Sequence, residues 1–327
     1  MTVTTGTTRT IVREHEAELL VQKAEMLAED VVALTLVSPD GEPLPSWSPG
    51  AHIDLVLADD LVRQYSLCSS PGDDAAWRVG VLRTPDSRGG SQRVHESLVE
   101  GTTLTVRGPR NHFPLVPAST YLFIAGGIGI TPILPMIAEA QAAGANWRLL
   151  YGGRHRGSMA FLPELTAYGD KVTVVPQDEA GVLDLDGALG TPQPGTLVYC
   201  CGPEGLLSAV EAKCASWLLG SLHLERFSAK PQEPSAAADE SFELVLQQTG
   251  VTVTVPPDKT VFQAAQEAGA NVLGSCMEGI CGTCETEVVE GDVDHRDSVL
   301  NDEERASNEF MMICVSRCKS KRLVLDI

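Results

Sequence analysis

The stretch that decides the fold of the last third of the chain is CMEGICGTC, at residues 276–284. It holds three of the nine cysteines of this 327-residue chain, and Cys314 and Cys318 follow it, while the other four cysteines are scattered upstream. The first 16 residues contain no apolar h-region of a secretory signal, and no run approaches the roughly 18 apolar residues of a membrane span. We therefore expect a cytoplasmic, reducing compartment, where clustered cysteines indicate metal or redox chemistry rather than disulfides.

The clustered cysteines have the spacing C-x4-C-x2-C, followed after 29 residues by a fourth cysteine. This spacing is typical of a plant-type 2Fe-2S centre, which takes four thiolates. The candidate ligands are Cys276, Cys281, Cys284 and Cys314, with Cys318 as an alternative fourth ligand. Gly279 and Gly282 would let the loop fold tightly, so that backbone N–H groups can donate to sulfur. A tetrahedral zinc site is the alternative, although its cysteines usually come as two short pairs.

Short β-rich runs alternate with turn residues between residues 18 and 117. The expected strands are 33–37, 52–57, 62–67, 77–82 and 103–107. Strands at this spacing predict a small antiparallel β-barrel. A β-sandwich without a ligand would have the same periodicity.

From residue 118 the pattern changes to strands that alternate with helices, which predicts an α/β domain with a parallel sheet. The expected strands are 121–125, 147–151, 172–176 and 196–201, and the expected helices are 132–143, 159–168 and 205–218. A Pro/Ala/charged stretch follows and is typical of a linker. Beyond it we expect a hairpin at 242–246 and 251–255 and a short helix at 261–268. The predicted organisation is an N-terminal extension (1–17), a barrel domain (18–117), an α/β domain (118–227), a linker (228–241) and an α+β cluster domain (242–327).

Residues in the barrel domain are suited to hold a flavin. An iron–sulfur cluster cannot accept a hydride, so a two-electron source would require a flavin as converter. Alternation along the strand 62–67 would place Arg63 and Tyr65 on one face, a cation for a phosphate and a ring for a flavin. Further along, Gly89 and Gly90 precede a helix-like run whose free N–H groups could bind the same phosphate. Taken singly, these two residues would more often be an ordinary strand tyrosine and a surface arginine.

The α/β domain carries a candidate pyrophosphate site in GGIGITP, at residues 126–132. The glycines would let a dinucleotide approach the backbone where a buried strand leads into a helix, with Thr131 as the expected N-cap and Pro132 at the first helical position. A second strand ends in Cys201-Gly202-Pro203, at the edge where open α/β sheets usually bind ligands. Cys201 alone would more often be a small buried apolar residue.

These motifs, in this order, resemble the phthalate dioxygenase reductase family. That family joins a flavin barrel, a nicotinamide domain and a C-terminal β-grasp ferredoxin domain of the plant type on one chain. It includes reductases of the vanillate demethylase type and reductase domains fused to self-sufficient haem-thiolate monooxygenases. The segment GPRNHF, at residues 108–113, is similar to the fused type.

The resemblance implies FMN as the flavin and assigns contacts residue by residue. The implied flavin contacts are Arg63, Tyr65, Ser66, Val81, Leu82, Arg83, Gly89, Gly90 and Ser91, with Thr131 and Phe227 from the second domain. The implied nicotinamide contacts are Gly126, Gly127, Cys201, Gly202 and Pro203. Cys201 would lie beside the reacting ring, and Phe227 would pack against the flavin, although plain packing between domains is the alternative for Phe227. Arg154 and Arg156 could pair with a 2′-phosphate and favour NADPH, whereas Asp178 and Glu179 could oppose it.

The implied function is that of an electron-transfer reductase. NAD(P)H would be oxidised by hydride transfer to FMN, and single electrons would pass through the 2Fe-2S cluster to a Rieske non-haem iron oxygenase, in a hydroxylation or O-demethylation system. A haem-thiolate monooxygenase is the alternative acceptor. A redox sensor without turnover is a third possibility, and we expect a monomer.

The charge balance bears on the partner. The chain has 44 Asp and Glu against 24 Lys and Arg, a net charge of −20, which argues against nucleic acid and anionic membrane surfaces. Several acidic residues precede the fourth ligand: Asp292, Asp294, Asp297, Asp302, Glu303, Glu304 and Glu309. They form either a solvated face or a docking surface for a basic partner.

Overall fold

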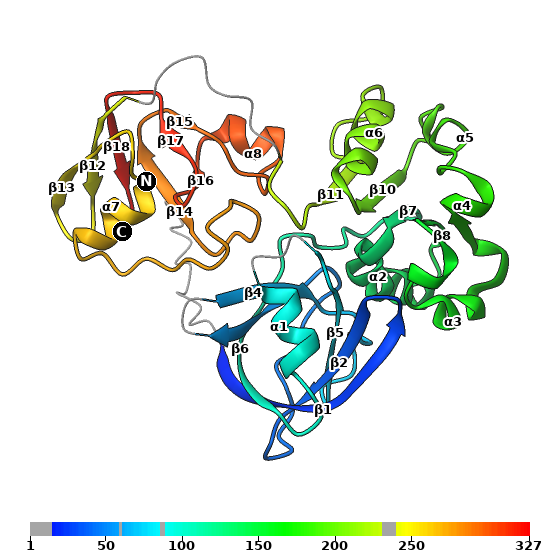
Figure 1. The fold of residues 1–327 in the computed structure, drawn as a ribbon. Coiled ribbons are helices and arrows are strands. Elements are labelled where there is room, and N and C mark those ends of the chain that lie inside the picture. Colours follow the sequence, from blue (N-terminus) through cyan, green and yellow to red (C-terminus); the bar gives the residue numbers. More distant parts are fainter. Residues whose placement is uncertain (1–14, 59–60, 86–88, 231–239) are drawn as a thin grey trace, which may run out of the picture.

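The computed structural model describes residues 15–58, 61–85, 89–230 and 240–327, which form three lobes, each built on its own sheet (Figure 1). Residues 1–14 of the expected N-terminal extension and residues 231–239 of the expected linker lie outside the described residues. No helix in the described ranges is long and apolar enough to cross a membrane.

The first lobe is an antiparallel barrel, as predicted. Its strands are β1 (Glu16–Ala28), β2 (Val31–Val37), β3 (His52–Ala58), β4 (Leu61–Ser66), β5 (Trp77–Leu82) and β6 (Thr103–Arg110), in the order β4-β3-β6-β1-β2-β5. A bridge between Leu67 and Val79 joins the two ends of this order and closes the sheet on itself. Alternate side chains, among them Leu34, Ile53 and Leu55, are fully buried inside. The helix α1 (Gly90–Ser97) covers one opening next to β4 and β5.

The second lobe is a parallel sheet with helices on both faces, also as predicted. Its strands are β7 (Thr120–Gly126), β8 (Asn146–Gly153), β9 (Val172–Pro176), β10 (Thr196–Cys201) and β11 (Leu222–Glu225), in the order β11-β10-β7-β8-β9. Its helices are α2 (Ile130–Ala142), α3 (Leu162–Leu165), α4 (Gln177–Ala180), α5 (Leu185–Leu189) and α6 (Glu204–Cys214), with 3-10 turns at Gly127–Gly129, Arg156–Ser158 and Thr166–Lys171. Successive residues of β7 face opposite cores, Phe123 toward α2 and Ile124 toward α6.

Three local predictions in this lobe were wrong. The expected helix at 159–168 is a short α3 followed by a 3-10 turn, because Phe161 and Gly169 take positive φ angles of 64° and 55° that interrupt a helix. The strand β11 at the edge of the sheet was not predicted. Thr131 is not an N-cap, since a 3-10 turn runs directly into α2 and Gly129 precedes its first residue without a side-chain cap.

The third lobe is a mixed α+β fold with the predicted hairpin and helix. Its main strands are β12 (Phe242–Leu246), β13 (Val251–Val255), β14 (Glu285–Glu290), β16 (Phe310–Met312) and β18 (Arg322–Leu325), with β15 (Val293–Asp294) and β17 (Arg317–Cys318) as a separate pair. The helices are α7 (Val261–Glu267) and α8 (Asp302–Ser307). Thr260 and Gln263 form a capping box at the start of α7, which fixes the residue at which that helix begins.

Side chains tie the barrel to the parallel-sheet lobe. Arg78 on β5 forms two hydrogen bonds to the carboxylate of Glu164 on α3, at 3.0 and 2.7 Å, and lies over the ring of Phe161. The hydroxyl of Tyr199 on β10 accepts from the N–H of Val116 and donates to the carbonyl of Pro114, which fixes the segment between the two lobes. The relative position of these two lobes is therefore set by specific contacts.

Candidate functional site

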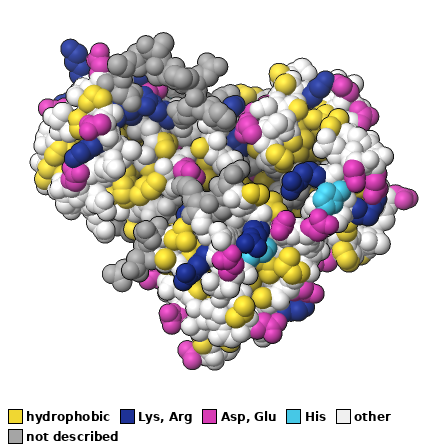
Figure 2. Space-filling model, in the orientation of Figure 1, with side chains coloured by type: hydrophobic (Ala, Val, Ile, Leu, Met, Phe, Trp, Pro, Cys, Tyr) yellow, Lys and Arg dark blue, Asp and Glu magenta, His cyan; other side chains and the backbone are white. Residues whose placement is uncertain are grey.

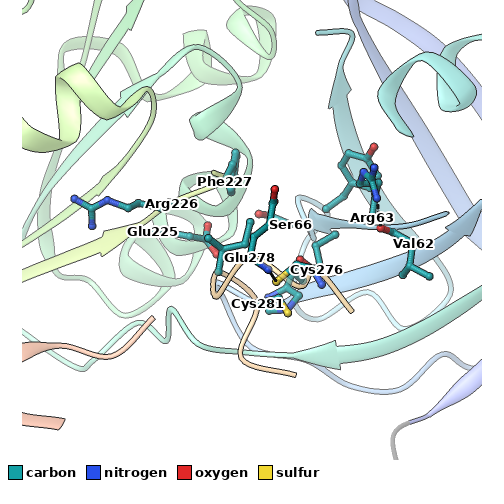
Figure 3. A pocket seen from close by; sticks show the side chains of 13 residues that line it. Val62, Arg63, Ser66, Glu225, Arg226, Phe227, Cys276, Glu278 and Cys281 are labelled. Carbon is teal, nitrogen blue, oxygen red and sulfur yellow. Dashed lines mark hydrogen bonds between the residues drawn. The ribbon is translucent and has the colours of Figure 1, made fainter. Parts of the chain in front are cut away.

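All three lobes contribute to one cavity of about 590 Å³, including its open mouth. Figure 3 shows its lining: Val62 and Arg63 from the barrel, Glu225 and Phe227 from the end of β11, and the cysteine loop between them. The enclosed part of the cavity measures only about 100 Å³, so a cofactor of flavin size would also fill its open mouth. A single cavity thus joins the predicted flavin strand to two of the predicted cluster ligands, Cys276 and Cys281.

The barrel side of the cavity is built by β3 and β4. Arg63, Tyr65 and Ser66 all line it, as the flavin hypothesis requires. Burial raises the pKa of Tyr65, so its phenol is neutral. His52, which sequence reasoning missed, also lines the cavity, and burial lowers its pKa to about 3. Its buried Nε2 has no hydrogen-bond partner among the described residues, so a polar ligand in the cavity would satisfy it.

The predicted phosphate residues lie beside this wall. A Cβ at Gly90 would lie 2.4 Å from Cγ of Arg63, so only glycine lets the arginine pass over the start of α1. Gly89 precedes that helix with φ 83°, in the left-handed region. Ser91 accepts a hydrogen bond from the N–H of Thr84 at 3.1 Å. The structure therefore brings Arg63 together with Gly89, Gly90 and Ser91, and their role as a phosphate site stays a prediction.

Other predicted flavin contacts lie outside the cavity lining. The side chain of Val81 is in the barrel core, and its carbonyl is within hydrogen-bond distance of Nε2 of His95. Arg83 points away and pairs with Glu96 at 3.0 Å, and Leu82 between them is half-buried. These three residues could reach a ligand only through their backbone. Thr131 is buried and donates to the carbonyl of Ile128, with its methyl group packed against Gly80 of β5.

The predicted nicotinamide residues meet at the carboxyl ends of β7 and β10. A Cβ at Gly126 would lie 2.7 Å from Cδ of Pro203, and one at Gly202 would lie 3.0 Å from Cα of Gly126. A Cβ at Gly129 would lie 2.3 Å from the carbonyl oxygen of Cys201. These close approaches pack the ends of the two strands against each other with no side chain between them. Gly127 and Gly202 are half-buried, and a role of this backbone in binding a dinucleotide stays a prediction. Gly127, which has φ 55°, begins the turn into α2.

Glu225 completes this corner, and reasoning from the sequence did not identify it. It pairs in register with Cys201, and the Cys201 thiol lies 3.9 Å from its Oε2. Ser66 of the barrel also hydrogen-bonds the Glu225 carboxyl. Burial raises the pKa of Glu225 to about 8, and burial with the neighbouring carboxyl raises the pKa of Cys201 far above that of a free thiol. Both groups are therefore neutral near pH 7. The local sequence does not reveal this site, because Glu225 meets Cys201 of a neighbouring strand and Ser66 of the barrel, both far away in the chain.

The residues considered for nucleotide choice lie at the ends of β8 and β9. Arg156 forms two hydrogen bonds to the carboxylate of Glu179, at 3.2 and 2.8 Å, and both side chains are exposed. Asp178 donates its N–H to the carbonyl of Arg154 at 3.2 Å. Arg156, which was expected to bind a 2′-phosphate, and Glu179, which was expected to oppose it, are thus paired with each other.

The four predicted ligands come together in the third lobe. The Cys314 thiol interacts with those of Cys276 and Cys284, and the Cys276 thiol interacts with that of Cys281. No three His, Cys, Asp or Glu side chains in the described ranges converge on a single ion, and a two-iron cluster does not require this, since its four thiolates are shared between two irons. The alternative ligand Cys318 lies on β17, 3.0 Å from the hydroxyl of Ser320.

The backbone of the cysteine loop fits a cluster. Met277, Gly279 and Gly282 take positive φ angles of 57°, 67° and 71°, which wrap the loop around the thiols. The N–H of Glu278 donates to Sγ of Cys276 at 3.3 Å. Such N–H donors stabilise thiolates and the sulfide that they would surround.

One member of the predicted acidic face was placed wrongly. Asp297 is buried, and its carboxylate accepts from the N–H groups of Val299 and Leu300 at 3.0 and 2.8 Å. It holds the turn that leads toward α8 and cannot serve as a docking charge. The reason is local, because a carboxylate that accepts two backbone donors is more stable inside a turn than in water.

Comparisons with known proteins agree with this geometry. Residues 244–319 match the model of the 2Fe-2S iron-sulfur cluster binding domain, and residues 123–212 match the oxidoreductase NAD-binding domain. The chain is 41% identical over 319 residues to the carnitine monooxygenase reductase subunit of Escherichia coli, covering 95% of this chain and 98% of the relative. It is 41% identical over 317 residues to a vanillate O-demethylase oxidoreductase of a Pseudomonas species, covering 95% and 99%.

Two solved structures are similar over 95% of this chain. The structure of phthalate dioxygenase reductase, described as a modular structure for electron transfer from pyridine nucleotides to [2Fe-2S], has 33% identity and a TM-score of 0.69, and 98% of it is covered. An intact type IV self-sufficient cytochrome P450 monooxygenase has 45% identity and a TM-score of 0.90, and this chain spans 41% of it.

A first prediction concerns Glu225. Because its folded pKa is raised to about 8 from an unfolded value near 4.5, the unfolded chain loses this proton first as pH rises, and stability falls between those values. Glu225→Gln removes this dependence, so its stability relative to the parent should rise by up to about 1.4 kcal/mol per pH unit across this window. Thermal unfolding from pH 5 to 8 measures it, with the exposed Glu243→Gln as control. Parallel profiles for parent and Glu225→Gln would contradict the assignment.

A second prediction separates the two candidates for the fourth ligand. Cys314→Ser should lose the visible absorbance of the cluster and most of its iron, because one iron would lack a thiolate. Cys318→Ser, four residues away, should retain both. Iron content per chain and the visible spectrum of the purified proteins provide the measurement, and cluster loss in Cys318→Ser alone would reverse the assignment.

Proposed function

Because this chain belongs to the phthalate dioxygenase reductase family, we propose that it is the reductase component of an oxygenase system, oxidising a nicotinamide dinucleotide and delivering single electrons to a separate oxygenase. The family uses FMN, NADH and a 2Fe-2S cluster. The observation that carries the proposal is the shared cavity, in which the barrel, the end of β11 and the cysteine loop lie against one another. FMN, when bound there, converts two-electron to one-electron chemistry, and the cluster carries one electron at a time.

The barrel residues hold the flavin. Arg63 and the first N–H groups of α1 bind the phosphate, since both a guanidinium and a helix N-terminus attract an anion. Tyr65 from the barrel and Phe227 from beyond β11 supply aromatic surface on the cavity wall. Phe227 is 43% exposed, unusually high for a phenylalanine, and a planar ligand would cover it. His52 offers its unsatisfied Nε2 to a polar edge of that ligand.

Cys201, Glu225 and Ser66 form the nicotinamide corner. All three are neutral near pH 7, so they can hydrogen-bond a bound ring and exclude water without adding charge. Hydride transfer between two bound rings needs no general acid or base, so these residues act by position. Gly127, Gly202 and Pro203 bind the pyrophosphate where the strands end, and the buried Gly126 lets these segments meet. Thr131 packs this corner against Gly80 on β5 of the barrel.

The Arg156–Glu179 pair supports NADH as the preferred donor. A 2′-phosphate would have to take Arg156 from a carboxylate that already binds it with two hydrogen bonds, and Glu179 would repel the phosphate. Arg154 and Asp178 flank the same edge of the sheet and help to shape it.

The acceptor we propose is a Rieske-type oxygenase. The support is that this chain covers nearly all of relatives that are named as separate reductase subunits, such as the carnitine monooxygenase reductase. A haem-thiolate monooxygenase is the second candidate, supported by the 45% identity to the reductase part of a self-sufficient cytochrome P450. Product formation with each purified oxygenase in turn separates the two. Rapid reduction of cytochrome c would exclude a sensor that does not turn over.

A third prediction tests the core proposal. Anaerobic addition of NADH to the protein loaded with FMN and cluster should bleach the absorbance of both, because the cavity places the two sites together. Phe227→Ala should bind FMN more weakly while keeping its cluster, whereas Phe310→Ala, on β16 of the third lobe, should leave FMN affinity unchanged. An unchanged spectrum after NADH addition to the fully loaded protein would disprove the proposed function.

A fourth prediction concerns nucleotide choice. Glu179→Gln frees Arg156 and removes the repelling carboxylate, so the kcat/KM ratio of NADPH to NADH should rise several-fold. Adding Arg156→Gln to that variant should cancel the gain. Steady-state reduction of ferricyanide with each nucleotide measures the ratio. If Glu179→Gln leaves the ratio unchanged, the pair does not contribute to nucleotide choice.

A further inference from the structure

The barrel segment Arg110-Asn111-His112 lies against the cysteine loop. It is part of the GPRNHF motif at residues 108–113 and has no role in the proposed function. Arg110 ends β6, and its Nη2 lies 2.6 Å from Oδ1 of Asp54 on the neighbouring β3. The two side chains are only 15% and 1% exposed, so this ion pair is largely removed from water. Burial of a guanidinium costs free energy that one carboxylate does not fully offset, so the other groups around Arg110 bear on its role.

Those neighbours belong to the cysteine loop. The guanidinium of Arg110 interacts electrostatically with the thiols of Cys281 and Cys276, the two ligands that line the shared cavity. The partner carboxylate of Asp54 is hydrogen-bonded by Ser275 and Gln64. Gln64 in turn donates to the hydroxyl of Ser275 at 2.9 Å, so the barrel binds the residue directly before the first ligand, Cys276.

His112 provides a second contact across the same boundary. A Cβ at Gly282 would lie 2.3 Å from Nε2 of His112, so the imidazole lies directly on the loop between two ligands. The other side of this ring stacks on His52, with centroids 5.9 Å apart. The loop is thereby held on the barrel at Ser275 and at Gly282, on both sides of Cys276 and Cys281, and Arg110 lies at a fixed place between these contacts.

A fixed cation at this place has an electrostatic consequence. Four thiolates and bound sulfide give a cluster net negative charge, and reduction adds one more electron to it. A positive charge nearby stabilises the reduced form more than the oxidised form, and burial strengthens the effect by lowering the local dielectric response. The cluster lobe itself is acidic, with 15 Asp and Glu against 7 Lys and Arg in residues 242–327, so its own charges act in the opposite direction.

We propose that Arg110 of the flavin barrel, held by Asp54 and positioned by the contacts of Gln64 and His112 with the cysteine loop, raises the reduction potential of the iron–sulfur cluster across the domain boundary. The cluster is then a better electron acceptor when it is docked on the barrel than its own lobe alone would make it. Arg110 is a positioning residue, since it acts through its charge on the cluster and touches no substrate. The inference rests on the proposed function in one respect, namely that the cluster is the group that receives electrons in the cavity and passes them on.

The test is a reductive titration of the full-length protein, loaded with FMN and cluster, in which the reduced cluster is counted by its paramagnetic resonance signal. For Arg110→Gln we expect the ratio of reduced to oxidised cluster, at a fixed potential, to fall about tenfold, which is about 59 mV for a one-electron couple. Arg110→Lys keeps the charge and should restore most of the ratio. Lys23→Gln removes an exposed charge that pairs with Glu25 on β1, and it should change nothing.

Asp54→Asn distinguishes charge from loosened packing. It removes an anion from the same buried pair, so the ratio of reduced to oxidised cluster should rise, in the direction opposite to Arg110→Gln. Equal iron and FMN contents in all variants show that they are folded and loaded. If Arg110→Gln leaves the ratio unchanged, or if both variants shift it in the same direction, the proposal is wrong. Dithionite with mediators reduces the cluster without NADH, so the result stands apart from whether NADH is the donor.

Discussion

Each binding corner of this protein depends on a glycine that lets the backbone or a side chain of another element come close, where a Cβ would meet its atoms at 3.0 Å or less. Gly90 lets Arg63 cross the start of α1, Gly202 lets the end of β10 meet Gly126, and Gly282 lets His112 lie on the cysteine loop. In all three cases, atoms of another element occupy the space that a side chain at the glycine position would fill. The glycines therefore act in pairs with a partner segment, and the two must be considered together.

Lys and Arg are outnumbered by Asp and Glu in this chain, 24 against 44. Several of these Lys and Arg side chains lie among the acidic side chains on the face shown in Figure 2, and others join elements to one another. Arg78 connects the barrel to α3, and Arg226, only 9% exposed, holds the end of β11 to α6 through Glu204 and Glu211. Glu225 and Phe227, the chain neighbours of Arg226, both line the cavity, so the ion pairs of Arg226 help to hold this wall in place. Arg110 belongs to the same class, because it lies where the barrel meets the cluster loop. The net charge of the chain thus conceals a small set of arginines, mostly removed from water, that join elements within a lobe or between lobes.

The sequence was informative wherever a site is built from one short segment. Cysteine spacing and the glycine turns each impose a local backbone geometry, and the structure brings together the residues that these motifs contain. Reasoning from the sequence missed His52, Glu225 and the Arg110–Asp54 pair, because each acquires its environment from residues far away in the chain. It also placed Thr131 at the start of a helix that begins earlier, since a 3-10 turn of glycines has no apolar period to reveal it. Contacts between lobes leave no periodic signal, and they are the contacts that build this cavity.

The same limit applies to the acidic residues before the fourth ligand, which the sequence presents as one cluster. In the folded chain they separate by task. Asp297 accepts backbone hydrogen bonds inside a turn, and Asp294 forms an ion pair with Arg296 at 2.6 Å. Glu304 caps the start of α8 by accepting from the N–H of Asn301. Asp292, Glu303, Glu304 and Glu309 are exposed. A partner that docks here would meet a smaller negative surface than the sequence suggests, because Asp297 is buried and Asp294 is paired with Arg296.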